Sequence, residues 1–168
     1  MGTGKSEVGR HVAKQLGRKF IDTDDLIERE EGMPIAQIFS QKGEPYFREL
    51  EKQMVIRVCA EGNAVIATGG GTIMNEENAN RLKASGTVIC LTATPEIILK
   101  RVRRDATRPL LQGGEPLTKI QTLLAARAET YARADVTIDT SRLNVNEVVQ
   151  AVLTVAEKEQ SGKHILSI

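Results

Sequence analysis

A short run of glycines and polar residues stands directly in front of a helical pattern. Gly2-Thr3-Gly4-Lys5-Ser6 is the last part of the phosphate-binding pattern G-x-x-x-x-G-K-[ST]. Glycines let successive backbone N–H groups turn toward phosphate oxygens, and the helix that follows adds the positive end of its dipole. The lysine would supply a positive charge next to the β- and γ-phosphates, and the serine hydroxyl could ligate Mg²⁺. The pattern predicts a nucleotide phosphate site. The alternative, a frayed chain start, is weaker because a helix pattern follows at once.

A pair of carboxylates forms the second candidate group. Asp22-Thr23-Asp24 follows a short apolar run, at the strand end where open parallel sheets bind their ligands. The period-two alternation of a strand would point Asp22 and Asp24 the same way, so one could serve a metal ion and the other a substrate hydroxyl. The alternative is that these acidic residues only cap a helix.

Strand and helix patterns alternate along the rest of the chain. Apolar runs predict strands at 20–22, 64–67, 87–91 and 136–139. Apolar spacing and capping residues predict short helices before Gly32 and Gly43, and longer helices over 5–16, 45–60, 75–85, 94–104, 117–134 and 144–159. Asn144 with Glu147 three residues later forms a capping box. The alternation predicts an α/β protein with a parallel sheet and helices on both faces.

Composition limits the class of protein. The 168 residues are enough for one domain, and 40% hydrophobic residues are too many for a disordered chain. Lys plus Arg (23) and Asp plus Glu (22) leave a net charge of +1, which argues against nucleic acid as a partner. No apolar run approaches the roughly 20 residues of a membrane span, and no signal region is evident. We expect a cytoplasmic protein without a membrane partner, with Cys59 and Cys90 as buried free thiols.

The ordered set of motifs resembles the shikimate kinases. The motifs are GTGKS, DTD (22–24), FRELE (47–51), ATGGG (67–71), RPLL (108–111), and a helix with Arg127 and Tyr131; together they extend from Gly2 to about Val155. The resemblance implies a three-layer α/β/α P-loop kinase fold of the nucleoside monophosphate kinase type, with strand order 2-3-1-4-5. It also implies transfer of the γ-phosphoryl of ATP to the 3-hydroxyl of shikimate in aromatic amino acid biosynthesis. The expected cofactor is Mg²⁺, and the enzyme is expected to be a monomer.

The resemblance also assigns roles on the nucleotide side. Residues 2–6 would hold the ATP phosphates, and Ser6 and Asp22 would hold Mg²⁺. Arg108 would close over the phosphates from a mobile loop at 105–116, and Arg101 would flank the adenine. Glu7 follows the serine where a hydroxyl residue often helps to hold phosphate, so we expect it to lower nucleotide affinity.

On the acceptor side, the resemblance places shikimate in a helical region at about 23–61. Asp24 would hydrogen-bond the shikimate hydroxyls and accept the proton of the attacking one. Arg48 and Arg127 would clamp the carboxylate, because guanidinium groups bind it bidentately. The backbone of Gly69, Gly70 and Gly71 would lie beside it.

Alternatives to these assignments stay open at this point. Arg48 could be a surface charge paired with Glu51 at i+3, and Arg127 could pair with some neighbour. The chain could be a kinase for another small polyol acid, such as gluconate. It could also be a truncated P-loop relative without catalytic activity.

The strand that normally feeds a phosphate loop does not precede this one. The first glycine of the pattern would lie two residues before Met1, so we expect domain 1–160 to lack strand 1 at the centre of its sheet, followed by a tail at 161–168. A sheet without its central strand leaves backbone groups unpaired. We therefore predict either a natural start upstream or a chain that is poorly folded, swapped or inactive.

Overall fold

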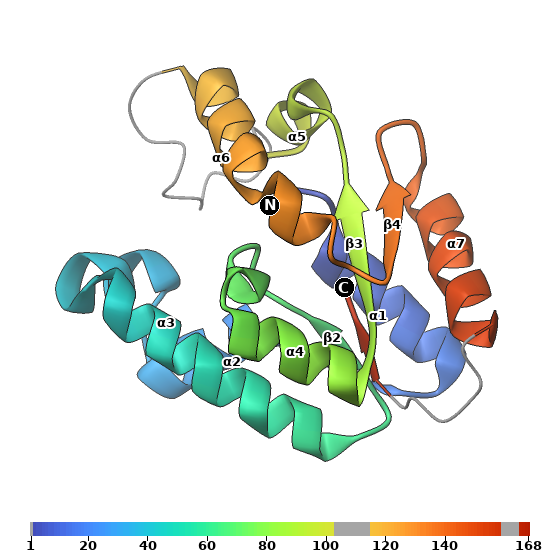
Figure 1. Ribbon diagram of the computed structural model, residues 1–168, viewed down its shortest axis with the longest axis horizontal. Helices are drawn as coiled ribbons and strands as arrows, with labels where there is room; N and C mark the ends of the chain where they lie inside the picture. Colours follow the sequence, from blue (N-terminus) through green and yellow to red (C-terminus); the bar gives the residue numbers. More distant parts are fainter. Residues whose placement is uncertain (1, 103–114, 159–164) are drawn as a thin grey trace.

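Five parallel strands form the sheet at the centre of the molecule (Figure 1). In this computed structural model, residues 2–102, 115–158 and 165–168 are described. The strand order across the sheet is β1 (Lys19–Asp22), β2 (Ala64–Ala67), β5 (Ile165–Ser167), β3 (Gly86–Thr92), β4 (Val136–Asp139). The parallel direction brings the carboxyl ends of the strands to one edge, where residues that follow different strands meet.

Helices cover both faces of this sheet, as the alternating pattern predicts. On one face α1 (Lys5–Leu16) and α7 (Val145–Lys158) pack against each other and against apolar side chains of β2, β3 and β5. On the other face lie α2 (Thr23–Glu31), α3 (Ile35–Glu61) and α4 (Glu76–Ser85). Helices α5 (Pro95–Val102) and α6 (Pro116–Tyr131) pack together near the end of β3 (Figure 1). The three-layer α/β/α fold is confirmed.

Alternating side chains join each strand to both helical layers. In β2, Val65 belongs to the core under α1 and α7, whereas Ala64 and Ile66 belong to the core under α2 and α3. In β3, Ile89 and Leu91 face the first core, and Val88 faces α4. The all-apolar strands therefore reflect burial on both faces.

Most predicted elements are confirmed, with differences at their ends. The capping box is present: Glu147 accepts from the Asn144 N–H at 2.7 Å, and the Asn144 side chain accepts from the Glu147 N–H at 3.1 Å. Gly43, with φ 83°, interrupts α3 where the sequence predicts a break. Helix α6 ends at Tyr131 rather than at 134. The predicted end of the 94–104 helix and most of the predicted mobile loop, including Arg108, lie outside the described residues.

The centre of the sheet differs from the prediction. The position expected to lack a strand is occupied by β5, which pairs in parallel with β2 on one side and with β3 on the other. The expected gap is therefore wrong, because the segment treated as a tail supplies the middle strand. The physical reason is that two open strand edges and an apolar core stabilise any short apolar segment that can reach them.

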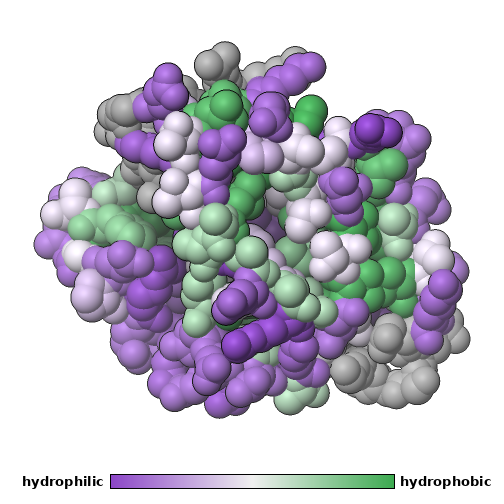
Figure 2. Space-filling view, turned by 45° about the horizontal axis from the view of Figure 1, so that its top comes forward, coloured by the Kyte–Doolittle hydropathy of each residue, from purple (hydrophilic) through white to green (hydrophobic). Residues whose placement is uncertain are grey.

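The surface is mixed in character. Hydrophilic residues surround smaller apolar areas on the face drawn in Figure 2. None of the helices in the described ranges has both the length and the hydropathy needed to cross a bilayer.

Cys59 and Cys90 are free and half-buried, and burial raises the pKa of both thiols.

Candidate active site

The phosphate loop leads directly into α1. Gly2 (φ 65°) and Gly4 (φ 84°) have left-handed backbone conformations that other residues adopt only with strain. A Cβ on Gly2 would also lie 2.6 Å from a methyl group of Val102 in α5. Hydrogen bonding within the helix begins with the Val8 N–H donating to the Gly4 carbonyl at 2.9 Å, so the amides of the first turn have no acceptor inside the helix. Amides and a helix dipole in this arrangement are able to hold an anion.

Ser6 and Asp22 meet beside this loop, although they are far apart in the sequence. The Ser6 hydroxyl donates to Asp22 Oδ2 at 2.6 Å. The other oxygen of Asp22 caps α2 by accepting from the N–H groups of Asp24 (3.1 Å) and Asp25 (3.4 Å). Asp22 thus caps a helix and also presents one oxygen next to the phosphate loop, and its predicted contact with a metal ion stays a prediction.

Asp24 lies in a different environment from Asp22. It sits in the first turn of α2, so the strand alternation proposed for it is wrong and the helix start sets its direction. Its Oδ1 is buried and has no hydrogen-bond partner. Burial, and then the nearby carboxylates of Asp22 and Glu51, raise the pKa of Asp24 from 3.8 to about 6, while Lys5 acts in the opposite direction. A carboxyl group with a pKa near 6 can accept a proton and release it near neutral pH.

Three successive glycines after β2 bring the acceptor-side residues together. A Cβ on Gly69 would lie 2.8 Å from Asp24 Oδ1, and a Cβ on Gly71 would lie 2.8 Å from Arg48 Nη1. Between them, the Gly70 carbonyl accepts from Arg127 Nη1 at 3.1 Å. Each glycine therefore lies beside a different residue that the resemblance assigns to substrate. The absence of side chains at 69 and 71 allows these close approaches.

Arg48 forms the ion pair with Glu51 that one interpretation of the sequence expects, and its role in holding a carboxylate stays a prediction. Its guanidinium group pairs with Glu44 at 2.7 Å and with the buried Glu51. It also lies within 5.4 Å of the centre of the Phe47 ring and against the Gly71 backbone. The side chain keeps 37% of its surface exposed, which leaves room for a ligand anion.

Glu51 is a buried residue that the sequence reasoning treated only as a possible surface partner of Arg48. It is 2% exposed, accepts from Thr72 Oγ1 at 2.7 Å, and pairs with Arg48. It thus ties α3 to the residue that follows the glycines and fixes the direction of the arginine. A signal was present, because Glu51 lies on the same helix face as the buried Phe47 and Met54, where an unpaired charge would be costly.

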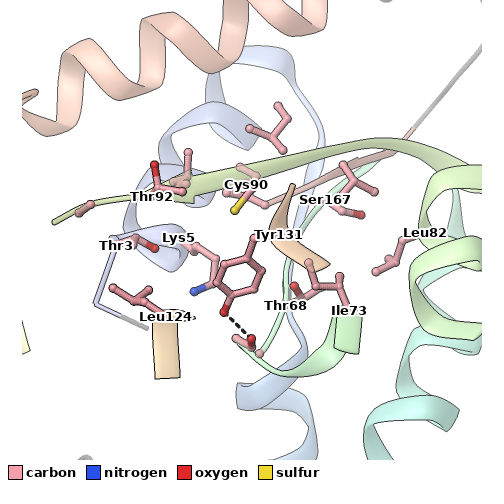
Figure 3. A pocket seen from close by; sticks show the side chains of 17 residues that line it. Thr3, Lys5, Thr68, Ile73, Leu82, Cys90, Thr92, Leu124, Tyr131 and Ser167 are labelled. Atoms are coloured by element: carbon pink, nitrogen blue, oxygen red, sulfur yellow. Dashed lines mark hydrogen bonds between the residues drawn. The ribbon is translucent and has the colours of Figure 1, made fainter. Parts of the chain in front are cut away.

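Arg127 and Tyr131 approach the glycines from α6, whereas Arg48 and Glu51 approach them from α3. They lie one turn apart on α6, and the Tyr131 hydroxyl donates to the Gly70 carbonyl at 2.7 Å (Figure 3). Arg127 Nη1 also lies 3.4 Å from the Tyr131 hydroxyl. The carbonyl of Gly70 therefore holds the last turn of α6 against the glycine loop, and two arginines from different helices flank this loop.

A cavity of about 60 Å³ connects these groups with the phosphate loop. Lys5, Tyr131 and Cys90 lie around it in Figure 3, with Thr3 and Ser167 on either side of them. The Oγ atoms of Thr3 and Ser167 are buried without a hydrogen-bond partner. Lys5 lowers the pKa of Asp24, against the larger effect of burial.

Two other predicted residues lie away from this cluster. Arg101, on α5, donates to the hydroxyl and the carbonyl of Thr140, each at 2.8 Å, and so holds the end of β4. Its predicted contact with adenine stays a prediction. Glu7 is exposed in the first turn of α1, and its effect on nucleotide affinity also stays a prediction.

A phosphate loop, a carboxyl group able to accept a proton and two arginines at the carboxyl edge of a parallel sheet define a P-loop kinase of small molecules. Comparison with known proteins identifies which one. The sequence model described as shikimate kinase matches residues 1–157, and the chain belongs to the shikimate kinase family.

Individual relatives agree with this family. The shikimate kinase of Thermodesulfovibrio yellowstonii is 42% identical over 97% of this chain and 94% of its own, and that of Caldanaerobacter subterraneus is 46% identical over 91% and 90%. The structure of Acinetobacter baumannii shikimate kinase in complex with shikimate superposes with a TM-score of 0.90 and 38% identity, covering 96% of this chain and 91% of that one. A gluconokinase from Sinorhizobium meliloti, at 18% identity and a TM-score of 0.51, shares the fold alone.

Proposed function

We propose that this chain transfers the γ-phosphoryl group of ATP to the 3-hydroxyl of shikimate and so serves aromatic amino acid biosynthesis. The observation that carries the proposal is the glycine loop: Gly69, Gly70 and Gly71 each contact a different one of Asp24, Arg127 and Arg48. A base and two guanidinium groups around one loop suit an acceptor that has both a hydroxyl and a carboxylate. The phosphate loop lies at the same edge of the sheet and provides the donor site.

The two arginines are proposed to hold the acceptor carboxylate. Both are already anchored, Arg48 by Glu51 and Arg127 by the Gly70 carbonyl, so little side-chain entropy is lost when the ligand binds. Planar guanidinium groups can bind a carboxylate through two parallel hydrogen bonds. This fixes the ring of the acceptor and turns one hydroxyl toward Asp24.

Asp24 is proposed to orient the attacking hydroxyl and take its proton. Its buried Oδ1 lacks a partner, and a substrate hydroxyl would satisfy it. Phosphoryl transfer needs little covalent help from the protein, so positioning and charge stabilisation supply most of the rate. Lys5 and the amides of the first turn of α1 are proposed to stabilise the charge on the transferred group.

Ser6 and Asp22 are proposed to hold Mg²⁺. Their oxygen atoms are the donors that this ion prefers, and they lie 2.6 Å apart next to the phosphate loop. Among the described residues there is no cluster of three or more His, Cys, Asp or Glu placed to hold a metal, so phosphates and water would have to supply the other ligands. When bound, the ion supplies positive charge that neutralises the phosphates.

The raised pKa of Asp24 predicts a pH dependence. Only the ionised carboxylate can accept a proton, and with a pKa of about 6 it is ionised above that pH. We expect kcat/KM for shikimate to rise about tenfold per pH unit below pH 6 and to level off above it, measured at saturating ATP. A profile that levels off near the ordinary value of 3.8 would contradict this role.

Arg48→Lys tests the carboxylate clamp while it keeps a positive charge beside Glu51. Lysine lacks the planar fork, so we expect KM for shikimate to rise about 10- to 100-fold and KM for ATP to change less than about twofold. Steady-state kinetics with each substrate varied in turn measures both. The matched control is Arg57→Lys on the same helix, where an exposed guanidinium pairs with Glu30 at 2.8 Å and both KM values should stay unchanged. Equal increases in both KM values for Arg48→Lys would contradict the role of Arg48 in binding the acceptor carboxylate.

An acceptor panel tests the proposed substrate itself. Purified protein with ATP and Mg²⁺ should phosphorylate shikimate with a kcat/KM at least about 100-fold above that for gluconate, because a hydrogen-bonding site rejects a poorly matched polyol. Equal rates would favour the alternative polyol kinase.

We also propose a monomeric, cytoplasmic enzyme, and light scattering of the purified protein tests the first of these properties.

A further inference from the structure

Two glutamates on the same helix share the guanidinium group of Arg48. Arg48 Nε and Nη2 both donate to Glu44 Oε1, at 3.0 and 2.7 Å, and Nη1 donates to Glu51. A guanidinium group has five N–H donors. Among the contacts of the described residues, Glu44 and Glu51 thus occupy three of these donors, and one hydrogen remains on each terminal nitrogen.

The two glutamates lie in opposite environments. The side chain of Glu51 is 2% exposed and also accepts from Thr72 Oγ1 at 2.7 Å, so this carboxylate is fixed inside the protein. The side chain of Glu44 is 60% exposed, and that of Arg48 is 37% exposed. Arg48 Nη1 lies on the inner side, against Gly71. Glu44 therefore covers the edge of the guanidinium group, formed by Nε and Nη2, that faces solvent.

The break in α3 places Glu44 at this edge. Gly43 has φ 83° and ψ 167°, so Glu44 is the first residue after the non-helical position, and Arg48 follows four residues later. Residues at i and i+4 of a helix lie on the same face, and an acidic residue that precedes a basic one at this spacing has the favourable orientation. The start of the second half of α3 therefore brings the Glu44 carboxylate onto Arg48.

The contact with Glu44 is of a kind that a ligand can displace. Both hydrogen bonds end on one oxygen, Oε1, whereas a carboxylate that meets a guanidinium edge squarely forms two parallel bonds through two oxygens. Exposed ion pairs within a helix also contribute little free energy. A ligand carboxylate and Glu44 thus compete for the same edge, and repulsion between their charges adds to the competition.

We propose that Glu44 is an internal competitor of the acceptor carboxylate at Arg48. This inference rests on the proposed function, because that function assigns Arg48 to the acceptor. Glu44 occupies the solvent-facing edge of Arg48 in this structure and leaves it when the acceptor binds. It therefore lowers the affinity for the acceptor. The phosphorylated product keeps the same carboxylate, so the return of Glu44 to Arg48 also favours product release.

Glu44→Gln tests the competition, because it keeps the size and one oxygen of the side chain but removes the charge. We expect the Kd for shikimate, measured by titration calorimetry without nucleotide, to fall about three- to tenfold, since the ion pair and the repulsion are lost together. The Kd for shikimate 3-phosphate should fall by the same factor. An unchanged or higher Kd for shikimate would overturn the proposal, because Glu44 would then only orient Arg48.

Two controls separate this competition from general electrostatics. The carboxamide analogue of shikimate has no charge to compete with Glu44, so its Kd should change less than about 1.5-fold in Glu44→Gln. Glu49 lies on the same helix, is exposed, and accepts from Gln53 Nε2 at 3.0 Å. Glu49→Gln changes the net charge equally and should leave the Kd for shikimate within about 1.5-fold. An equal fall in Kd for the two variants would contradict the proposal.

A second readout does not depend on shikimate. Phenylglyoxal forms covalent bonds to the nitrogens of accessible guanidinium groups, and mass spectrometry of the digested protein gives the labelling rate at each arginine. Glu44→Gln weakens the cover of the Nε–Nη2 edge, so labelling of Arg48 should become about threefold faster or more. Labelling of Arg57, which pairs with Glu30 on the same face of neither glutamate, should stay unchanged.

The labelling result also separates this proposal from the proposed function. Equal labelling of Arg48 in the unsubstituted protein and in Glu44→Gln would overturn the proposal, even where shikimate binds to both. If labelling of Arg48 becomes faster but neither protein binds shikimate, the proposed function fails, while the assignment of Glu44 as the residue that covers Arg48 holds.

Discussion

Asp24→Asn is expected to lower kcat by about three orders of magnitude, within the range measured for loss of a general base. Asparagine keeps the size and one oxygen of the carboxyl group but cannot take a proton. KM for ATP should change less than about twofold, because Asp24 faces the glycines of the acceptor loop. Steady-state assays at saturating ATP and shikimate measure the change.

The adjacent residue provides a matched control. Asp25 lies on the same helix turn but is about half exposed and pairs with Arg10 at 3.2 Å. Asp25→Asn should leave kcat within about twofold, because exposed ion pairs contribute little. If the two variants lost activity to the same extent, the effect would come from the start of α2 rather than from the chemistry of one carboxylate.

The same substitution should also change stability in a defined direction. The folded pKa of Asp24 is about 6 and its ordinary value is 3.8, so between these pH values the native state binds more protons than the unfolded chain. Stability from this group therefore falls as pH rises through the window and stays lower above pH 6. We expect Asp24→Asn to melt at the same temperature as the unsubstituted protein near pH 3.8 and several degrees higher at pH 8. Lower activity with higher stability is the signature of a residue kept for function.

The second large effect is expected at the phosphate loop. Lys5→Met should reduce kcat/KM for ATP by about 10²–10³, because one charged group aimed at a transferring phosphoryl is worth that much. Methionine keeps the length and the apolar stem, so the loss reports the charge. Lys14→Met, an exposed position in the last turn of the same helix, is the control and should have no effect.

A second readout separates charge from folding in this variant. Lys5 acts against the burial that raises the pKa of Asp24. Without the lysine, the pKa of Asp24 should rise further, and the pH midpoint of the residual activity should move upward. A midpoint that does not move would mean that the two residues do not share one electrostatic site.

The two halves of the site depend on short loops at one edge of the sheet. The phosphate loop leads into α1, and the Gly69–Gly71 loop follows β2; both end near the cavity that Lys5 and Tyr131 line. A side chain at Gly69 would meet Asp24, Glu51 and Thr72 at 2.8–3.1 Å, which only a shift of buried polar groups could relieve. The glycines therefore let the arginines and the carboxyl group lie against one loop.

Much of the fold and the site could be predicted from local sequence. Helix α1 has an apolar stripe and ends at Gly17, and β2 is a four-residue apolar run, so neighbouring residues specify both. The phosphate loop has residue types and spacing that few other sites need. The order of the motifs carried the resemblance to the shikimate kinases, and the family is confirmed, whereas the roles of single residues stay predictions.

Other features could not be predicted because they depend on contacts between distant residues. Glu51 looked like a surface charge until α3 packed against the residue after the glycines. Arg101 holds Thr140, 39 residues away, and no local pattern reports such a bond. The raised pKa of Asp24 comes from burial and from carboxylates on other elements.

The sequence by itself determined the local elements, the phosphate loop and the residue types available for catalysis, because these depend on spacing along one helix, strand or turn. The tertiary structure alone decided what stands at the centre of the sheet. Three strand residues are too few to carry a periodic signal, and only the open edges of β2 and β3 and the core under α1 and α7 give Leu166 and Ile168 their place.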